Sequence, residues 1–465
     1  MSGAQASQSA QGPSADFVPA DGKQDNDAPA LSAAQREYKA EPPKDAGQAA
    51  GPKQREDPFF LPAPEIPTQE GPRGIRFDFN DGARVLLPQG SWHVQLEDDE
   101  AGNILFACDA DGGWVVSTKK YYAPFRIRVW DRDREGDKDG NNANEPILDH
   151  PMDLKGQPVL LKFPVGTLGD LIGWFPYAEK FLRKHECILE CSMGQPIIDL
   201  IKDQYPDMSF VAPPEVRMKE PYASYRIGLF FGGNLDHQPF DFRMVGLHRT
   251  AGHILGVDPE EERPRLKLTG AREIPEPYVC IATKSTNLAK MWNNGFGWEQ
   301  VIVHLKSLGY RVLCIDRDRT VGHGFVWNKF PDGAEDFTGN IPLQRRVDLL
   351  RHADFFIGLS SGLSWLAWGT GIPVVLVSGF SLPGCEFRTP YRVINTHGCY
   401  GCWDAMDQRF DHNDYYWCPR HKGTERQFEC SRLITGKQVI SAIERLRADL
   451  GLVAPKDSGK AVRGA

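Results

Sequence analysis

The sequence predicts an α/β fold with two Rossmann-like domains, preceded by a small antiparallel β-domain. Three observations lead to this prediction. Short strand patterns fill residues 74–135, strand and helix patterns alternate through residues 150–270, and a second alternating set runs through residues 271–452. Strand–helix alternation favours parallel sheets with right-handed crossovers. Two such sets favour two domains that face each other across a cleft.

The two ends of the chain differ in composition from the rest. Residues 1–57 are rich in Ala, Gln, Gly, Pro, Ser and Asp and hold almost no large apolar side chains, and residues 455–465 are similar. Such segments cannot bury enough apolar surface to offset the entropy of ordering. We therefore expect both to be disordered tails.

The predicted β-domain, residues 74–135, consists of short runs of strand-forming residues. Arg84-Val-Leu-Leu and Trp92-His-Val-Gln-Leu are two of them, and Asn80-Asp-Gly and Glu100-Ala-Gly-Asn supply turns between runs. We expect four to six strands here. The segment shows no chemistry of its own, so its expected role is structural or in docking.

Each Rossmann-like domain repeats a strand followed by a helix. In the first, Val159-Leu-Leu-Lys-Phe is a predicted strand and a helix is predicted from Asp170 to Lys184. In the second, Tyr278-Val-Cys-Ile-Ala precedes a helix predicted from Gly297 to Leu308. Prolines near residue 270 mark a linker. A last helix, from Lys437 to Leu450, is expected to pack across both domains.

Charge and hydropathy exclude two classes of partner. A net charge of −8 at pH 7 argues against nucleic acid or an anionic membrane surface. The window from Phe355 to Phe380 lacks charged residues, but its five glycines, four serines and Pro373 are typical of a buried helix and strand rather than a membrane span. No secretory signal is visible. We predict a cytoplasmic protein without a membrane span.

Gly166-Thr-Leu-Gly-Asp170 lies between a predicted strand and a predicted helix. Glycines allow a backbone to approach a ligand closely, and a helix N-terminus presents free N–H groups. Asp170 would lie at the carboxyl edge of the sheet, where α/β folds bind ligands. It is either a general base for an acceptor hydroxyl or a cap of its own helix.

Two stretches of the second domain are candidates for binding a diphosphate. Ser360-Ser-Gly-Leu-Ser-Trp365 opens a helix, so Ser361 and Gly362 could surround phosphate oxygens or could form an ordinary capped turn. Lys284 and Lys290 follow the first strand of this domain. They could neutralise a departing diphosphate or be solvated loop lysines.

Polar residues at later strand and helix ends extend the candidate site. Asp316 ends the second strand of this domain and could accept a hydrogen bond from a ribose hydroxyl or form a turn. Gln344 begins a later helix and is a further possible polar contact. We predict a reaction without a divalent cation. Asp131-x-Asp133 lies in a charged loop, and Asp316-x-Asp318, although it follows a strand, is not expected to bind a metal.

Four cysteines near the C-terminus form the strongest local pattern. Cys399, Cys402, Cys418 and Cys430 lie within 32 positions. Four thiolates fit a closed tetrahedral site for zinc or a single iron, with a redox or disulfide role as the alternative. A closed site has no open position, so we expect the metal to be structural. The other six cysteines are expected to be reduced core thiols.

Together these motifs make the chain similar to the bacterial autotransporter heptosyltransferases, GT-B enzymes that transfer heptose from ADP-heptose to serines of autotransporter adhesins. The resemblance covers roughly residues 74 to 452. It rests on Gly166–Asp170, Lys284–Trp292 with the following Gly297-Trp298, Ser361–Ala367, Val377–Ser381 and the four cysteines. Lipopolysaccharide heptosyltransferases have motifs like the Gly-Asp and Ser-Gly-Leu stretches, but the four-cysteine insertion distinguishes the autotransporter group.

The resemblance implies roles for residues of the first domain and for the metal. Asp170 would be the general base of an inverting protein O-glycosylation, and Thr167, Leu168 and Gly169 would line the donor site. The metal would be one ferric iron per chain, held in a finger of residues 397–432. The family also forms homo-oligomeric rings, typically of twelve subunits, through the β-domain and the finger.

The resemblance also implies roles in the second domain. Lys290 and Gly362 would contact the donor diphosphate, and Asp316 would lie near the nucleoside. Two other functions remain alternatives. A lipopolysaccharide-type heptosyltransferase would favour a basic or amphipathic membrane-facing surface. A non-catalytic scaffold stapled by the metal would use the β-domain and the finger for protein contacts and would not bind an ADP-sugar.

Overall fold

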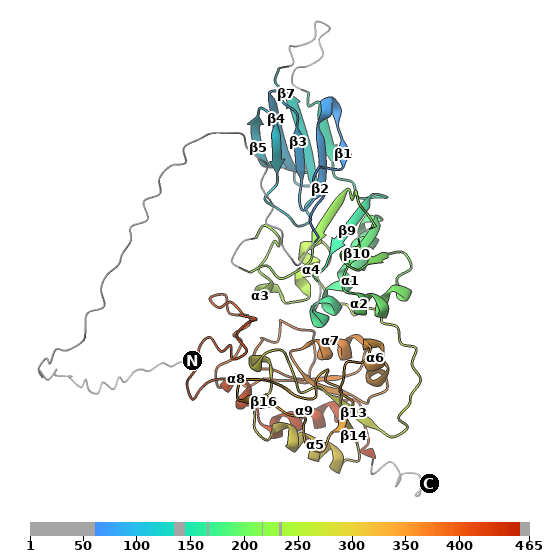
Figure 1. Ribbon diagram of the computed structural model, residues 1–465, viewed down its shortest axis with the longest axis vertical. Helices are drawn as coiled ribbons and strands as arrows, with labels where there is room; N and C mark the ends of the chain where they lie inside the picture. Colours follow the sequence, from blue (N-terminus) through green and yellow to red (C-terminus); the bar gives the residue numbers. More distant parts are fainter. Residues whose placement is uncertain (1–60, 134–144, 165–166, 216, 232–234, 456–465) are drawn as a thin grey trace, which may run out of the picture. The chain divides into compact units, whose positions relative to one another are not determined.

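A computed structural model describes residues 61–133, 145–164, 167–215, 217–231 and 235–455 (Figure 1). All of them fall within one compact unit, residues 51–465. The tail predicted for residues 1–57 lies outside the described residues, as does the tail of residues 455–465 apart from Pro455.

The N-terminal region is built from eight short strands: β1 (Gln69–Glu70), β2 (Arg76–Asn80), β3 (Arg84–Leu87), β4 (Trp92–Asp98), β5 (Asn103–Ala110), β6 (Gly113–Val116), β7 (Phe125–Asp131) and β8 (Leu148–Pro151). Buried and half-buried side chains alternate along β4 and β7, as expected for strands with one face on a core. These two strands are central in an antiparallel sheet of order β5-β4-β7-β8. The predicted antiparallel β-structure is therefore present.

The other half of this region continues into the first Rossmann-like domain. β2, β3 and β6 pair antiparallel with one another, and β2 also pairs in parallel with β12 (Ala223–Arg226), with Ala223 opposite Phe79. This pairing covers an edge of the Rossmann sheet that would otherwise expose unpaired backbone groups. The sequence suggested a separate β-domain for residues 74–135, whereas here one of its sheets extends the next domain.

The first Rossmann-like domain consists of β9 (Pro158–Lys162), α1 (Leu168–His185), β10 (Ile188–Ser192), α2 (Gln195–Ile201), β11 (Ser209–Val211) and β12, followed by the short helices α3 (Phe242–Val245) and α4 (Arg249–Ile254). Its parallel strands have the order β11-β10-β9-β12. The strand order therefore reverses beside β9, the strand that leads into α1.

The second domain consists of β13 (Tyr278–Ile281), the 3₁₀ turn η3 (Leu288–Lys290), α5 (Gly297–Ser307), β14 (Arg311–Cys314), β17 (Glu335–Asp336), α6 (Leu343–Arg351), β18 (Phe356–Leu359), α7 (Gly362–Gly369), β19 (Val374–Val377), β20 (Arg392–Val393), α8 (Glu429–Arg432) and α9 (Gly436–Asp449). Its parallel strands have the order β17-β14-β13-β18-β19-β20. The order reverses between β13 and β18, and in such sheets the crevice at the carboxyl ends of the two strands beside the reversal binds ligands.

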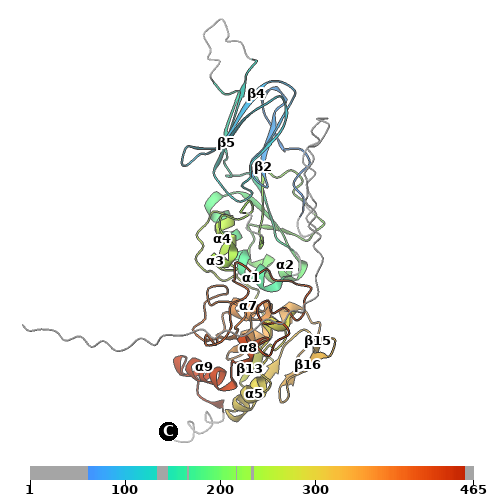
Figure 2. The same cartoon turned by 90° about the vertical axis from the view of Figure 1, so that its left-hand side faces the viewer.

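Three further features of the second domain bear on the predictions. The uncharged window from Phe355 to Phe380 forms β18, α7 and β19, which confirms the predicted buried unit. No helix in the described ranges is long and apolar enough to cross a membrane. α9 packs on α5, β19 and β20 of its own domain rather than across both domains as expected. A hairpin of β15 (Val321–His323) and β16 (Val326–Asn328) lies on the opposite side of this domain from α9 (Figure 2).

Candidate functional site

The N-termini of α1 and α7 meet at the carboxyl ends of β9 and β18. A Cβ atom on Gly169 would lie 2.8 Å from Cδ1 of Trp365 and 3.3 Å from the Cα of Gly362. A Cβ on Gly362 would lie 2.9 Å from the Cβ of Leu168. Both positions thus require glycine, and the structure brings the Leu168–Gly169 and Ser361–Gly362 motifs into contact.

Trp365 of α7 fills the groove between these helices. Its ring would clash with a Cβ on Gly173, one turn after Gly169 on α1. The ring also lies 5.4 Å from the ring of His248 and 5.0 Å from that of Phe387. Sequence reasoning noted Trp365 only as part of a motif. Its role as the wedge between the two domains depends on contacts with residues far away in the chain.

Gly169→Ala should therefore destabilise the protein by about 1–3 kcal/mol, because the added methyl must displace Trp365 or Gly362. Urea unfolding measures the change. Gly295→Ala is the matched control, since Gly295 is exposed and a Cβ there would meet nothing within 4 Å. Equal unfolding free energies for the two variants would contradict the close packing of α1 on α7.

Asp170 lies half-buried in the first turn of α1. Burial raises the pKa of its carboxyl group, while the Lys290 ammonium and a hydrogen bond from Thr167 act in the opposite direction. A carboxylate of raised pKa is a stronger base than an ordinary aspartate. This environment suits a group that takes a proton from a hydroxyl.

Lys290 and Lys284 have different surroundings. Lys290 ends η3, and burial lowers the pKa of its ammonium group while Asp170 opposes this shift. Lys284 is buried, and its Nζ donates to Thr283 Oγ1 at 2.7 Å and to the carbonyl of Lys329 at 2.8 Å. Of the two predicted lysines, Lys290 accompanies Asp170, and Lys284 is committed to protein acceptors.

Asp316 holds together the loops that follow β13 and β14. Its carboxylate is buried and accepts hydrogen bonds from Thr283 N at 2.9 Å, Thr283 Oγ1 at 2.9 Å and Lys284 N at 3.1 Å. The residue thus lies beside the strand-order reversal, as predicted for a nucleotide site, but its side-chain oxygens already have protein donors.

Gln344 and Ser361 each have a buried side-chain oxygen without a hydrogen-bond partner in the described residues. The Gln344 Nε2 donates to the linker carbonyl of Lys267 at 2.8 Å and to Asp348 Oδ1 at 3.0 Å. Ser361 is the residue before α7, and within the described residues its buried Oγ has no hydrogen-bond partner. A hydroxyl of this kind, at a helix N-terminus, is available to an anionic ligand.

Sequence reasoning missed a buried polar network behind the start of α7. Ser360 Oγ lies 2.8 Å from Ser378 Oγ and 2.7 Å from Ser381 Oγ. Both Ser360 and Ser381 donate to Oε1 of Glu386, whose Oε2 accepts from Arg392 at 2.7 Å. The serines follow the ends of β18 and β19, a signal that could have found them. Nothing local in the sequence pointed to Glu386.

The four cysteines of the finger lie near one another. Burial raises the pKa of Cys402 to about 12, with Cys399 as a further cause. Burial also raises the pKa of Cys430 to about 12, with contributions from the other three thiols. A bound cation would reverse these shifts, because thiols are deprotonated when they bind a metal.

Glu429 braces this group of thiols. Its Oε1 accepts from the backbone N of Cys399 at 2.6 Å, and Arg426 binds both carboxylate oxygens. The Arg426 hydrogen bonds lower the pKa of Glu429 to about 2. Ligand atoms of Cys399, His421 and Glu429 also lie within 4.8 Å of one another, but Glu429 is already neutralised by Arg426. Four thiolates are ligands that zinc and iron prefer, and the four-cysteine site stays a prediction.

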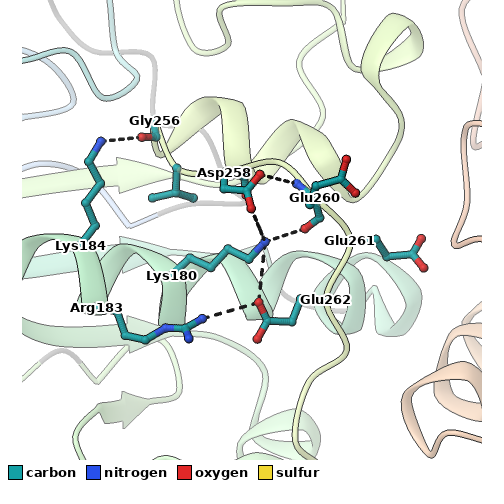
Figure 3. A pocket seen from close by; sticks show the side chains of 9 residues that line it. Lys180, Arg183, Lys184, Gly256, Asp258, Glu260, Glu261 and Glu262 are labelled. Atoms are coloured by element: carbon teal, nitrogen blue, oxygen red, sulfur yellow. Dashed lines mark hydrogen bonds and ion pairs between the residues drawn. The ribbon is translucent and has the colours of Figure 1, made fainter.

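A charged hollow lies along the C-terminal half of α1, where Lys180, Arg183 and Lys184 face the loop of residues 256–262 (Figure 3). Lys180 donates to the carbonyl of Glu260 at 2.6 Å, and Arg183 lies 3.5 Å from Glu262. Lys184 donates to the carbonyl of Gly256 at 2.8 Å. Because its cations have protein partners, this hollow does not resemble a phosphate site.

Family models match two parts of the chain. The model described as Glycosyltransferase TibC, N-terminal domain, matches residues 71–133. The model described as Glycosyltransferase family 9 (heptosyltransferase) matches residues 244–398, which include β13, β18 and the N-terminus of α7.

Curated relatives match most of the chain. Autotransporter heptosyltransferases from Citrobacter rodentium and from Escherichia coli O78:H11 (TibC) are each 62% identical over 392 residues, which cover 84% of this chain and 94% of the relative. A relative from Burkholderia thailandensis, named inactive autotransporter heptosyltransferase BimC, is 42% identical over 389 residues, 83% of this chain and 89% of the relative.

The fold agrees with these relatives. The crystal structure of TibC, described as a dodecameric iron-containing heptosyltransferase in complex with ADP-heptose, matches with a TM-score of 0.81 and 62% identity, over 84% of this chain and all of that one. This likeness confirms the predicted fold with two Rossmann-like domains. The chain is a glycosyltransferase that belongs to the autotransporter heptosyltransferase family.

Proposed function

We propose that this chain transfers heptose from ADP-heptose to serine hydroxyls of an autotransporter adhesin, with inversion at the anomeric carbon. The observation that supports this most is that the start of α1, which bears Asp170, packs against the N-terminus of α7, where the charge of Lys290 acts on the Asp170 carboxyl group. A base, a cation and a set of free N–H groups are what a single displacement of a diphosphate requires. The relatives named above act as precedent for the sugar and for the acceptor.

In the proposed reaction, Asp170 takes the proton of the acceptor serine while the serine oxygen attacks the anomeric carbon. The bond from that carbon to the diphosphate oxygen breaks, and ADP leaves with the electron pair. One displacement inverts the configuration. Charge that develops on the diphosphate is stabilised by Lys290 and by Ser361 and Gly362 at the start of α7.

The remaining predicted residues shape the donor site. Thr167, Leu168 and Gly169 line it through their backbone at the α1 N-terminus. Lys284 and Asp316 join the loops after β13 and β14 and so form the wall on the nucleoside side. Because the Asp316 carboxylate already accepts four hydrogen bonds, the Asp316-x-Asp318 pair is a poor ligand set for a catalytic cation. The proposed reaction needs no divalent ion.

We further propose one structural metal per chain, bound by Cys399, Cys402, Cys418 and Cys430. It is ferric iron by analogy with the iron-containing relative, with zinc as the alternative. When bound, the metal supplies a cross-link that orders the finger. Because cysteines left reduced are typical of the cytoplasm, the proposed site of reaction is cytoplasmic.

We also propose a homo-oligomeric ring, with TibC, which is described as dodecameric, as the precedent for assembly. The edge strand β5 exposes Ile104, Leu105 and Phe106, and the tip of the β15–β16 hairpin exposes Phe325 fully. Exposed apolar residues on an edge strand and on a hairpin tip favour contacts with other chains.

Co-expression with a candidate autotransporter adhesin, followed by intact-mass analysis of the adhesin, tests the proposed function. The expected result is a series of heptose-sized mass increments on the adhesin. In a separate assay, transfer by the purified enzyme should be unaffected by brief EDTA treatment. A thermal-shift assay with ADP separates the alternatives. No binding of ADP would favour the scaffold, whereas binding and transfer only to a lipid-linked sugar would favour a lipopolysaccharide-type enzyme.

A further inference from the structure

Three aromatic rings surround the ammonium group of Lys290. Its Nζ lies 5.1 Å from the ring centroid of Phe410, 5.4 Å from that of Trp403 and 5.6 Å from that of Phe380. All three distances fall within the range of cation–π attraction. The rings also contact one another, with centroids 5.4 to 5.6 Å apart. We call these three rings the lysine cage.

Two of the three rings come from the four-cysteine finger. Trp403 directly follows Cys402, and Phe410 lies between Cys402 and Cys418. Phe380 follows β19, where the backbone N of Trp403 donates to its carbonyl at 3.1 Å. The finger therefore reaches the catalytic region through two aromatic side chains, one of them adjacent in sequence to a proposed metal ligand.

The finger also holds the backbone that bears Lys290. Asn287, which caps η3, donates from Nδ2 to the carbonyl of Asp414 at 2.6 Å, and Leu288 N donates to the carbonyl of Tyr415 at 3.2 Å. Trp292 Nε1 donates to the carbonyl of Ile434 at 2.8 Å. Both the main chain and the side chain of Lys290 are thus positioned by residues around the finger.

A cage of rings holds a cation differently from a carboxylate or a carbonyl. In the described part of the chain, the Lys290 ammonium donates no hydrogen bond to a protein acceptor, whereas Lys284 donates two. Ring faces attract positive charge without occupying N–H donors. The Lys290 ammonium is therefore fixed in place while its donors stay free for anionic oxygens.

We propose that Trp403 and Phe410 are positioning residues for donor binding, because they hold Lys290 in a three-ring cage aimed at the diphosphate of the sugar nucleotide. This inference rests on the proposed role of Lys290 in the transfer. It gives the finger a second task, which is to shape the donor site. The cage acts on donor binding, because the proposed reaction places the Lys290 ammonium against the diphosphate.

Replacement of Phe410 by mono-, di- and trifluorinated phenylalanine tests the cage. Fluorine withdraws electron density from the ring face and hardly changes its shape, so a purely structural role would be insensitive to the series. The expected result is a KM for ADP-heptose that rises with each fluorine, by about threefold to tenfold in total, at an unchanged KM for the acceptor. Metal content, measured on each variant, should remain that of the wild type.

Two controls make the result unambiguous. The same analogues at Phe355, a buried ring that contacts Tyr310 instead of a cation, should leave both KM values unchanged. Lys290→Met should raise the KM for ADP-heptose and lower kcat. Suppose that Lys290→Met raises the KM for ADP-heptose but that this KM shows no trend across the Phe410 series. This result would contradict the role of the cage and leave the proposed function intact. An unaffected Lys290→Met would overturn the proposed role of Lys290 itself.

Discussion

Asp170→Asn should lower kcat for heptose transfer by about 10²- to 10⁴-fold, because an amide of nearly the same shape cannot accept the serine proton. Binding of ADP-heptose should persist, since the helix N-termini and Lys290 remain. Single-turnover kinetics and calorimetric titration with the donor measure the two effects separately. Asp199→Asn, at an exposed position on α2, is the matched control and should transfer heptose at the wild-type rate.

The pH dependence of kcat/KM provides a second measurement of the same assignment. The base acts when deprotonated, and burial raises the pKa of Asp170, so the acid limb should lie above the ordinary aspartate value of about 3.9. Lys290 acts when protonated, and burial lowers its pKa, so the alkaline limb should lie below the ordinary lysine value of about 10.4. An active Asp170→Asn variant with the wild-type acid limb would remove Asp170 from the role of base.

Cys418→Ser should abolish metal binding and unfold the finger, because a serine hydroxyl is a poor substitute for a buried thiolate ligand. Isolated zinc fingers gain about 10–16 kcal/mol from their metal. Loss of the site here should therefore lower the melting temperature strongly. Because Trp403 and Phe410 belong to the finger, the KM for ADP-heptose should rise as well.

Metal analysis of the purified protein, combined with its visible absorption spectrum, measures occupancy and distinguishes ferric iron from zinc. Cys108→Ser is the control, since Cys108 lies on β5, outside the finger, and should leave the metal content unchanged. If Cys418→Ser kept a full complement of metal, the four-cysteine site would be wrong, and the nearby His421 and Glu429 would need a new assessment.

Much of the fold follows from local patterns. The helix expected from Asp170 to Lys184 corresponds to α1, and the strand expected at Tyr278 corresponds to β13. Hydrophobic periodicity and glycines at strand ends are properties of neighbouring residues, so they can be recognised without the tertiary fold. Pairing between strands far apart in the chain leaves no local signal, so the parallel pairing of β12 with β2 could not be predicted.

The candidate site divides in the same way. Asp170, Ser361 and Gly362 could be found because each stands where a helix begins after a strand, and the four cysteines because of their spacing. Their catalytic and binding roles stay predictions. Position after a strand did not separate Lys284 from Lys290, and only the family resemblance assigned the diphosphate contact to Lys290. Gln344 stays a predicted polar contact, with Nε2 bound to the linker carbonyl of Lys267.

The sequence alone therefore determined which residues are candidates for catalysis and binding, because residue type and position at a strand end can be recognised from short stretches of sequence. Only the tertiary structure decided which of them meet. The charge of Lys290 rather than Lys284 acts on Asp170, and Trp403 and Phe410 of the finger enclose Lys290. These choices depend on packing between segments far apart in the chain, where burial and ring faces fix the position of a charge.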